Sequence, residues 1–212
     1  TRAKMPTFGT NPIAFSAPSR LNQPLALDMA TSTVAVGKVK LAAYEDQLMP
    51  SGWIVNDKGE NVVDPHQAFD GTGRLKENYG ITPLGGLEAL SSHKGYGLAI
   101  MVEVLCSMLT GSPFIGTLKD RTQHETGHFF IVIDPERFRD FVDFSSDLDD
   151  MTIHLRGLEP INPEKPVLVP GDLENTTKVE RLEKGIPMPK PLAQNIMDIC
   201  NECEADYLFG EL

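Results

Sequence analysis

The sequence predicts an α/β fold; one observation supports this class, and a second argues against a Rossmann domain within it. Short apolar runs with the character of strands alternate along the chain with segments of helical periodicity, as in α/β proteins. The Gly-x-Gly-x-x-Gly fingerprint of a Rossmann domain is absent, because Gly95-Tyr96-Gly97 lacks the third glycine. Residues 1–212 contain no internal repeat and no boundary marked by composition, so the whole chain is expected to belong to one such fold.

Composition and charge exclude several classes of partner. The chain has 212 residues, of which 41% are hydrophobic and 23% charged, as is usual for globular proteins. Its formal net charge of −11 opposes binding to nucleic acid. No apolar run approaches the ~20 residues of a membrane span, and no secretion signal is visible at the start. The low count of 3 cysteines indicates a reducing, cytoplasmic location. Together with the charge and the lack of a membrane span, we expect a protein that binds neither nucleic acid nor membrane.

The first quarter of the chain predicts two strands and a helix. Asn11–Pro18 is an apolar run bracketed by prolines, and Leu25–Met29 is a second short apolar run. The segment that follows, to about Glu45, is expected to be helical, with Thr31 or Ser32 as its N-cap.

A hairpin and a long connection are expected next. Trp53–Val63 contains two short strands around the turn Asn56–Gly59. Asp64–Gly86 is rich in glycine and proline and has no clear period, so it is expected to be a long irregular connection of a kind that is often functional.

The strongest helical pattern runs from Leu98 to Leu109, with Ser91 or Ser92 as a cap before it and Gly111 after its last turn. The elements expected beyond it are a strand at 129–133, helices at 135–144 and 145–155, a short strand at 167–169 and a final helix at 191–203.

The start of that helix has the composition of an anion site. A helix N-terminus offers unpaired N–H groups and the positive end of a dipole. Gly95 and Gly97 would let a ligand approach the backbone closely, and Lys94 adds a full charge. The segment therefore suits a phosphate or carboxylate, although a surface helix with a solvated lysine fits its spacing equally well.

Eight short motifs, taken together and in order, resemble the malate/L-lactate dehydrogenase family of the second type. That family also contains ureidoglycolate and sulfolactate dehydrogenases, diketogulonate reductases and cyclic-imine reductases. The similarity covers nearly the whole chain. The motifs are Gly9–Phe15, Asp28–Ser32, Pro50–Trp53, Leu84–Gly86, His93–Leu98, Gly127–Phe130, Pro170–Asp172 and Gly185–Pro187.

The resemblance implies a mixed-sheet, non-Rossmann dinucleotide-binding fold of the sulfolactate dehydrogenase type. It implies hydride transfer between NAD or NADP and a small 2-hydroxy or 2-oxo acid, with malate or L-lactate favoured, by a homodimer. Two other functions stay open: a reductase of diketo sugar acids or cyclic imines, and a non-catalytic module that binds an anion or dinucleotide.

The resemblance also assigns roles to residues. Asp28 is expected to accept hydrogen bonds from ribose or amide, or else only to cap the following helix. Asp172 stands where the family commonly has glutamate, which shortens the reach of the carboxylate. The residues expected to contact the cofactor are Asp28, Met29, Ala30, Thr31, His93, Lys94, Gly95, Pro170, Gly171 and Asp172.

Two further assignments compete with plain turn roles. Thr10, Asn11 and Pro12 are candidates for the substrate pocket, and Asp57 is a candidate to orient a catalytic histidine. Cys200 and Cys203 form a single C-x2-C pair with neither a second pair nor a histidine at zinc-ligand spacing, so no metal site is predicted.

The acid/base group of the reaction is expected outside this chain. Residue 1 is threonine, and the sequence runs at once into a strand. In the family the acid/base histidine and the arginine for the substrate carboxylate belong to the N-terminal portion. Residues 1–212 are therefore expected to be the cofactor-binding domain plus a C-terminal helical segment, without that portion.

Overall fold

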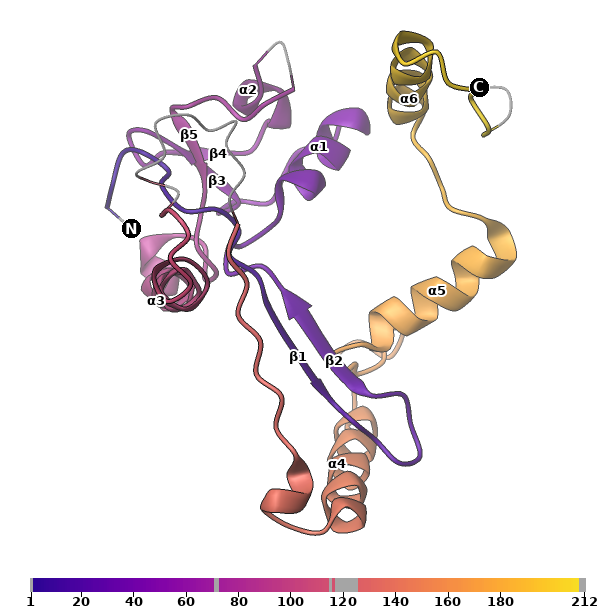
Figure 1. Cartoon of the computed structure of the whole chain (residues 1–212). Helices are drawn as coiled ribbons and strands as arrows, with labels where there is room; N and C mark the ends of the chain where they lie inside the picture. Colours follow the sequence, from indigo (N-terminus) through magenta and orange to yellow (C-terminus); the bar gives the residue numbers. More distant parts are fainter. Residues whose placement is uncertain (1, 71–72, 115, 117–125, 210–212) are drawn as a thin grey trace. The chain divides into compact units, whose positions relative to one another are not determined.

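The chain forms two units whose sequences interleave. The computed structural model describes residues 2–70, 73–114, 116 and 126–209 (Figure 1). The first unit comprises residues 1–10, 30–99 and 186–212, and the second comprises residues 11–29 and 100–185. Both units contain helices and short strands, and this confirms the predicted α/β class. Among the described helices, none is long and apolar enough to cross a membrane.

The first unit is built around a three-stranded antiparallel sheet of order β4-β3-β5. Its strands are β3 (Ile54–Asn56), β4 (Asn61–Val62) and β5 (Tyr79–Ile81). Its helices are α1 (Val36–Tyr44), α2 (Pro65–Ala68), the start of α3 (His93–Glu103) and α6 (Lys190–Glu202). A 3-10 turn at Glu88–Leu90 precedes α3. The buried core is Val34, Val39, Met49, Ile54, Val62 and Ala68.

The predicted hairpin is confirmed, but the connection after it is more ordered than its composition indicates. Ile54 pairs with Val62, and the Gly59 N–H donates to the Asn56 carbonyl at 2.9 Å. Residues 64–86 were expected to be irregular, and this was wrong for α2 and β5. The strand β5 has three residues and forms because β3 offers it an edge, and local sequence carries no signal of such a distant partner.

The predicted N-cap of α1 is wrong. The helix begins at Val36 with Ala35 as its N-cap, and no side chain caps it. The two hydroxyls expected to accept from helix N–H groups act as donors instead. Ser32 Oγ donates to the Val34 carbonyl at 2.7 Å, and Thr31 Oγ1 donates to the Thr10 carbonyl at 3.1 Å.

The second unit contains the two predicted N-terminal strands. β1 (Ile13–Ala17) and β2 (Leu25–Met29) pair as an antiparallel hairpin in which Ala14 lies opposite Asp28. The helices expected at 135–144 and 145–155 are a 3-10 turn at Pro135–Arg137 and one continuous helix, α4 (Phe141–Arg156). The strand expected at 167–169 is absent, and α5 (Asp172–Lys184) follows instead.

Two helix predictions hold. α3 covers His93–Glu103 and continues as a π-helical segment over Val104–Met108, before Gly111 at φ +78°. The final helix, expected at 191–203, is α6.

The strand expected at 129–133 is extended but pairs with nothing in the described parts of the chain. A strand exists only where a neighbour completes its hydrogen bonds, and none of the described strands lies beside it.

A buried carboxylate joins the β1–β2 loop to α4. Asp149 is 2% exposed. It accepts hydrogen bonds from Ser19 Oγ at 2.5 Å and Asn22 Nδ2 at 2.7 Å, and from the N–H groups of Arg20 and Leu21 at 3.1 and 3.0 Å. These bonds, led by the one from Ser19, lower the pKa of Asp149 to about 2.

This carboxylate gives a pH prediction. The pKa of an aspartate in an unfolded chain is about 3.9. The native state favours the ionised form of Asp149, so its contribution to stability is complete above pH 4 and is lost as pH falls toward 2. We expect urea midpoints to fall over that range, and the Asp149→Asn variant to show a lower midpoint at pH 7 and a flatter profile. A variant whose profile matches the parent would contradict this role.

Candidate functional site

Thr31 connects the predicted cofactor segment, Asp28–Thr31, to the predicted substrate segment at Thr10. Its side chain is 1% exposed. Its N–H donates to the Thr10 carbonyl at 2.9 Å, and its hydroxyl donates to the same oxygen at 3.1 Å. The end of the Asp28–Thr31 segment, predicted to contact cofactor, is thereby held against Thr10, predicted to line the substrate pocket.

Leu84 joins this pair to the start of α3. Its N–H donates to the Thr31 carbonyl at 2.9 Å, and its own carbonyl accepts from the Gly95 N–H at 3.2 Å. Gly95 is buried so closely that a Cβ added to it would lie 2.7 Å from the Leu84 Cα and nearer still to its N and O atoms. We call this chain of bonds through Thr10, Thr31, Leu84 and Gly95 the Thr31 network.

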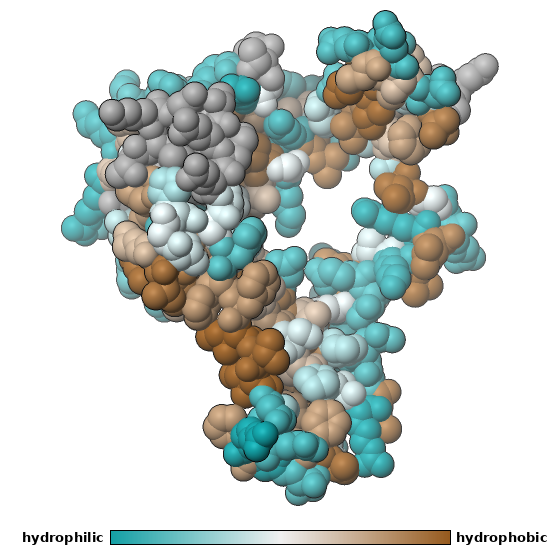
Figure 2. Space-filling model, viewed as in Figure 1, coloured by the Kyte–Doolittle hydropathy of each residue, from teal (hydrophilic) through white to brown (hydrophobic). Residues whose placement is uncertain are grey.

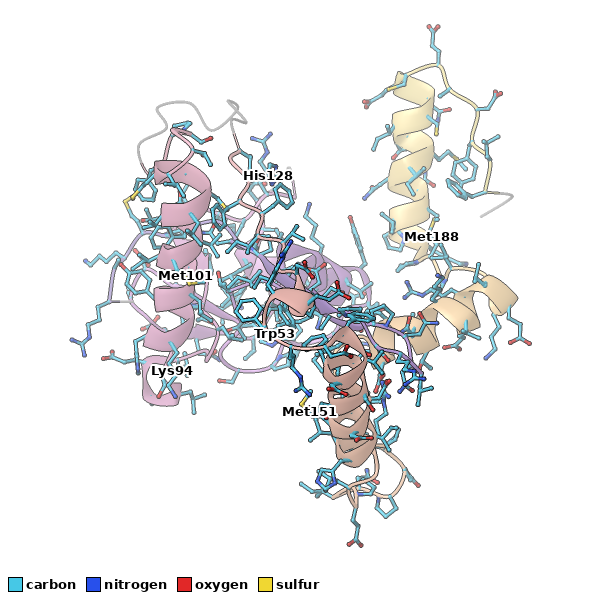
Figure 3. The ribbon with its side chains drawn as sticks, turned by 60° about the horizontal axis from the view of Figure 1, so that its bottom comes forward. Trp53, Lys94, Met101, His128, Met151 and Met188 are labelled. Atoms are coloured by element: carbon cyan, nitrogen blue, oxygen red, sulfur yellow. The ribbon has the colours of Figure 1, made fainter. Side chains whose placement is uncertain are left out.

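The first turn of α3 carries exposed cation-capable side chains above that buried glycine. His93 and Lys94 are exposed, and Lys94 makes no ion pair with any described residue. Figure 3 shows Lys94 at the end of the helix remote from Met101. The turn is shaped by Ser91, at φ +69°, whose carbonyl accepts from the Lys94 N–H at 3.0 Å. The expectation of unpaired N–H groups here is wrong, because those of Lys94, Gly95 and Tyr96 donate to the carbonyls of Ser91, Leu84 and Ser92. What the turn offers an anion is the Lys94 side chain at the positive end of the helix dipole.

Asp28 does not cap α1, which was its alternative role. The helix begins at Val36, eight positions further on, with Ala35 as its cap. Asp28 lies on β2 opposite Ala14, and its side chain is exposed. Within the described residues no hydrogen bond or ion pair engages its carboxylate, so the group is available as an acceptor.

The Pro170–Asp172 turn is held against β2. The Ala26 N–H donates to the Pro170 carbonyl at 3.4 Å. Gly171, at φ +100°, is the N-cap of α5, and a Cβ there would lie 3.5 Å from the Ala26 N and O atoms.

The Asp172 carboxylate is already engaged. It accepts from Arg156 Nε at 3.0 Å and Nη2 at 2.8 Å, and from the Val169 N–H at 3.0 Å. The bidentate bond from Arg156 lowers the pKa of Asp172. Arg156 was missed by the sequence analysis, because it stands 16 positions earlier on another helix and no motif contains it.

Glu103 is a second residue that the sequence analysis missed. It is 6% exposed and accepts from Asn11 Nδ2 and from Ser107 Oγ, each at 2.9 Å. Asn11 stands at φ +41°, in the left-handed region, so this contact helps to hold the Asn11–Pro12 turn. The sequence did carry a signal of this buried carboxylate: Glu103 is the one acidic residue in an apolar helix, and Ser107 follows one turn later, within hydrogen-bonding reach.

Asp57 lies at the exposed tip of the β3–β4 hairpin. Within the described residues no histidine bonds to it, and His66 faces Asp46 at 3.0 Å instead. Its role in orienting a histidine stays a prediction. In the same described ranges, no group of three or more His, Cys, Asp or Glu side chains is arranged to hold a metal ion.

The malate/L-lactate dehydrogenase family model matches residues 1–197, nearly the full chain. The chain belongs to the malate/L-lactate dehydrogenase family. This confirms the resemblance drawn from the eight motifs.

Curated relatives in the family carry more than one activity name. The chain is 34% identical over 203 residues to the malate/(S)-sulfolactate dehydrogenase of Methanothermus fervidus, covering 94% of this chain and 54% of the relative. It is 33% identical over 205 residues to the Delta(1)-pyrroline-2-carboxylate/Delta(1)-piperideine-2-carboxylate reductase of Pseudomonas syringae pv. tomato, covering 93% and 53%. The chain spans about half the length of these relatives.

Solved structures agree with the family assignment. The malate dehydrogenase of Entamoeba histolytica superposes with a TM-score of 0.83 at 26% identity, over 97% of this chain and 58% of that one. The sulfolactate dehydrogenase of Methanocaldococcus jannaschii superposes with a TM-score of 0.68 at 27% identity, over 97% and 58%. The predicted non-Rossmann fold of the sulfolactate dehydrogenase type is therefore confirmed.

Proposed function

We propose that this chain is the cofactor-binding part of an NAD- or NADP-dependent oxidoreductase that acts on a small 2-hydroxy or 2-oxo acid, with malate or L-lactate favoured. The Thr31 network is the observation that carries the proposal. It binds together, through backbone atoms, the predicted cofactor segments at Thr31 and Gly95 and the predicted substrate segment at Thr10.

The start of α3 would bind the pyrophosphate. Lys94 offers an ammonium group with no ion-pair partner in the described chain, at the positive end of the helix dipole. The N–H groups of Lys94, Gly95 and Tyr96 already donate to backbone carbonyls, so the side chain and the dipole carry the contact. Since Gly95 is buried against Leu84, its role is to seat the helix, and the contact with phosphate falls to His93 and Lys94.

The nicotinamide end is assigned to Asp28–Thr31. The exposed Asp28 carboxylate would accept from ribose hydroxyls or from the carboxamide N–H. Met29 and Ala30 are half-buried, and Thr31 is held by Thr10 and Leu84, so the backbone here is preorganised. When bound, the nicotinamide supplies or accepts the hydride.

The third assigned contact is the Pro170–Asp172 turn. Because Arg156 and the Val169 N–H already engage the Asp172 carboxylate, we assign that side chain to shaping the turn. The exposed Pro170 and the backbone of Gly171 would then be the atoms offered to the cofactor. Asp28 and Lys94 would provide the charged contacts.

The proton transfer is assigned to a histidine outside residues 1–212. Oxidation of a hydroxy acid needs a group that takes the hydroxyl proton as the hydride leaves. We also propose a homodimer and a cytoplasmic location. An assay of the protein in its full native length, with malate, L-lactate, sulfolactate and ureidoglycolate against NAD and NADP, tests the activity. Turnover of none of the four would contradict the dehydrogenase assignment.

Reduction of cyclic imines is the second candidate, because a named imine reductase is 33% identical over 93% of this chain. Turnover of Δ1-pyrroline-2-carboxylate with NADPH or NADH, in the absence of hydroxy-acid oxidation, would favour it.

Lys94→Ala tests the pyrophosphate contact. A charge-assisted hydrogen bond contributes about 1.5–3 kcal/mol, so we expect affinity for NADH or NADPH to fall on the order of 10- to 150-fold. Titration of cofactor fluorescence measures the effect. Lys58→Ala, at the exposed hairpin tip, is the matched control and should bind like the parent. Equal affinity in the two variants would remove Lys94 from the site.

A further inference from the structure

Residues 127–133 form an extended chain whose apolar side chains face solvent in the second unit. Figure 2 shows hydrophobic surface where Figure 1 draws this stretch. A contiguous run of exposed apolar side chains marks an interaction surface. The five exposed residues, with fractions from 37% to 96%, are Phe129, Phe130, Ile131, Val132 and Ile133.

The two ends of this stretch have defined contacts. Gly127 packs so tightly on the π-helical segment that an added Cβ would collide with the Cys106 carbonyl and lie 2.5 Å from Thr110 Oγ1. At the other end, the Asp134 carboxylate accepts from the Glu136 N–H at 3.1 Å and caps the 3-10 turn. Between these two points, residues 128–133 are all exposed.

The backbone N–H and C=O groups of this stretch lack strand partners among the described residues. Residues 127–133 make no backbone hydrogen bond to any described residue. Within the same unit, β1 pairs with β2 alone among the described strands, which leaves its second edge open. In the view of Figure 1 the stretch descends past β1 on the side away from β2.

The side chains indicate where such a strand belongs. Successive side chains of a strand point to opposite faces, so Phe129, Ile131 and Ile133 lie on one face. Phe130 and Val132 lie on the other face. A strand that is apolar on both faces is typical of the interior of a covered sheet rather than of its edge. An exposed edge of this kind also promotes aggregation, which natural proteins avoid by covering it.

We propose that residues 127–133 form one wall of a slot for an additional β-strand, and that polypeptide of the same protein outside residues 1–212 supplies this strand. The relatives from Methanothermus and Pseudomonas are matched over only 54% and 53% of their length, so the family has ample further chain. Only a strand offers alternating N–H and C=O groups to the open edges.

Hydrogen exchange tests the slot directly. We expect amides of residues 128–133 to exchange at least 100-fold more slowly in the protein of full native length than in the 212-residue chain. Equal exchange in the two forms would overturn the proposal. So would protection in the 212-residue chain that grows with its concentration, because that result would identify a second copy as the occupant.

Val132→Lys provides the matched variant. Val132 is 96% exposed, so the substitution should leave the melting temperature of the 212-residue chain unchanged. In the protein of full native length, where the slot is filled, it should lower that temperature by about 5 °C or more. Ile161→Lys, at a fully exposed loop residue of the same unit, should change neither form. An unchanged melting temperature for Val132→Lys at full length would contradict the slot. The readouts involve no cofactor, so they are independent of the proposed activity.

Discussion

Gly95→Ala is expected to destabilise the chain by about 3 kcal/mol or more, although it adds a single methyl group to a helix. The added Cβ would lie 2.7 Å from the Leu84 Cα and closer still to the Leu84 N and O atoms. Backbone cannot rotate away as a side chain can, so the helix start must shift. That shift would break the bond from the Gly95 N–H to the Leu84 carbonyl, and with it the Thr31 network. Urea unfolding measures the loss.

Gly97→Ala, two residues further along, is the matched control. A Cβ at Gly97 meets nothing within 4 Å, so alanine should stabilise the helix by about 0.5–1 kcal/mol through its better propensity. Cofactor titration of both variants extends the test to the proposed site, where we expect only Gly95→Ala to lose affinity. Equal free energies of unfolding for the two variants would show that the close approach of α3 to Leu84 does not contribute to stability.

Arg156→Ala is expected to lower the free energy of unfolding by about 2–3 kcal/mol. Its guanidinium holds both oxygens of Asp172, whose side chain is only 18% exposed, so the carboxylate would be left with one donor, the Val169 N–H. The expected loss lies between that of an exposed and that of a fully buried pair. The pKa of Asp172 is lowered in the native state, so the pair stabilises the chain above about pH 4 and less as pH falls.

Arg137→Ala separates this effect from the loss of any arginine. Arg137 pairs with Asp134 at 3.4 Å, but both side chains are more than half exposed, and we expect a change below about 0.5 kcal/mol. A double-mutant cycle of Arg156→Ala with Asp172→Asn should give a coupling energy of at least about 1 kcal/mol. Independent effects of the two substitutions would mean that the ion pair does not hold the turn.

Local sequence was sufficient wherever an element depends on its own residues. The β1 and β2 strands, the β3–β4 hairpin and helices α3 and α6 follow from apolar periodicity and turn residues close together in the chain. The family assignment was also available, because eight short motifs in order identify it without knowledge of their contacts. Where an element depends on a distant neighbour, the prediction failed: β5 was missed, and 129–133, expected to be a strand, has no strand partner among the described residues.

The sequence by itself determined the fold class, the family and the residue types offered to an anion at the start of α3. Only the tertiary structure decided what each of those residues is used for. It commits Thr31 and Gly95 to a buried backbone network, the Asp172 carboxylate to Arg156, and Asn11 to the buried Glu103. The reason is physical: propensity and periodicity act over a few residues, whereas a hydrogen-bond partner is selected by burial, which brings together groups as far apart as Ser19 and Asp149, 130 positions along the chain.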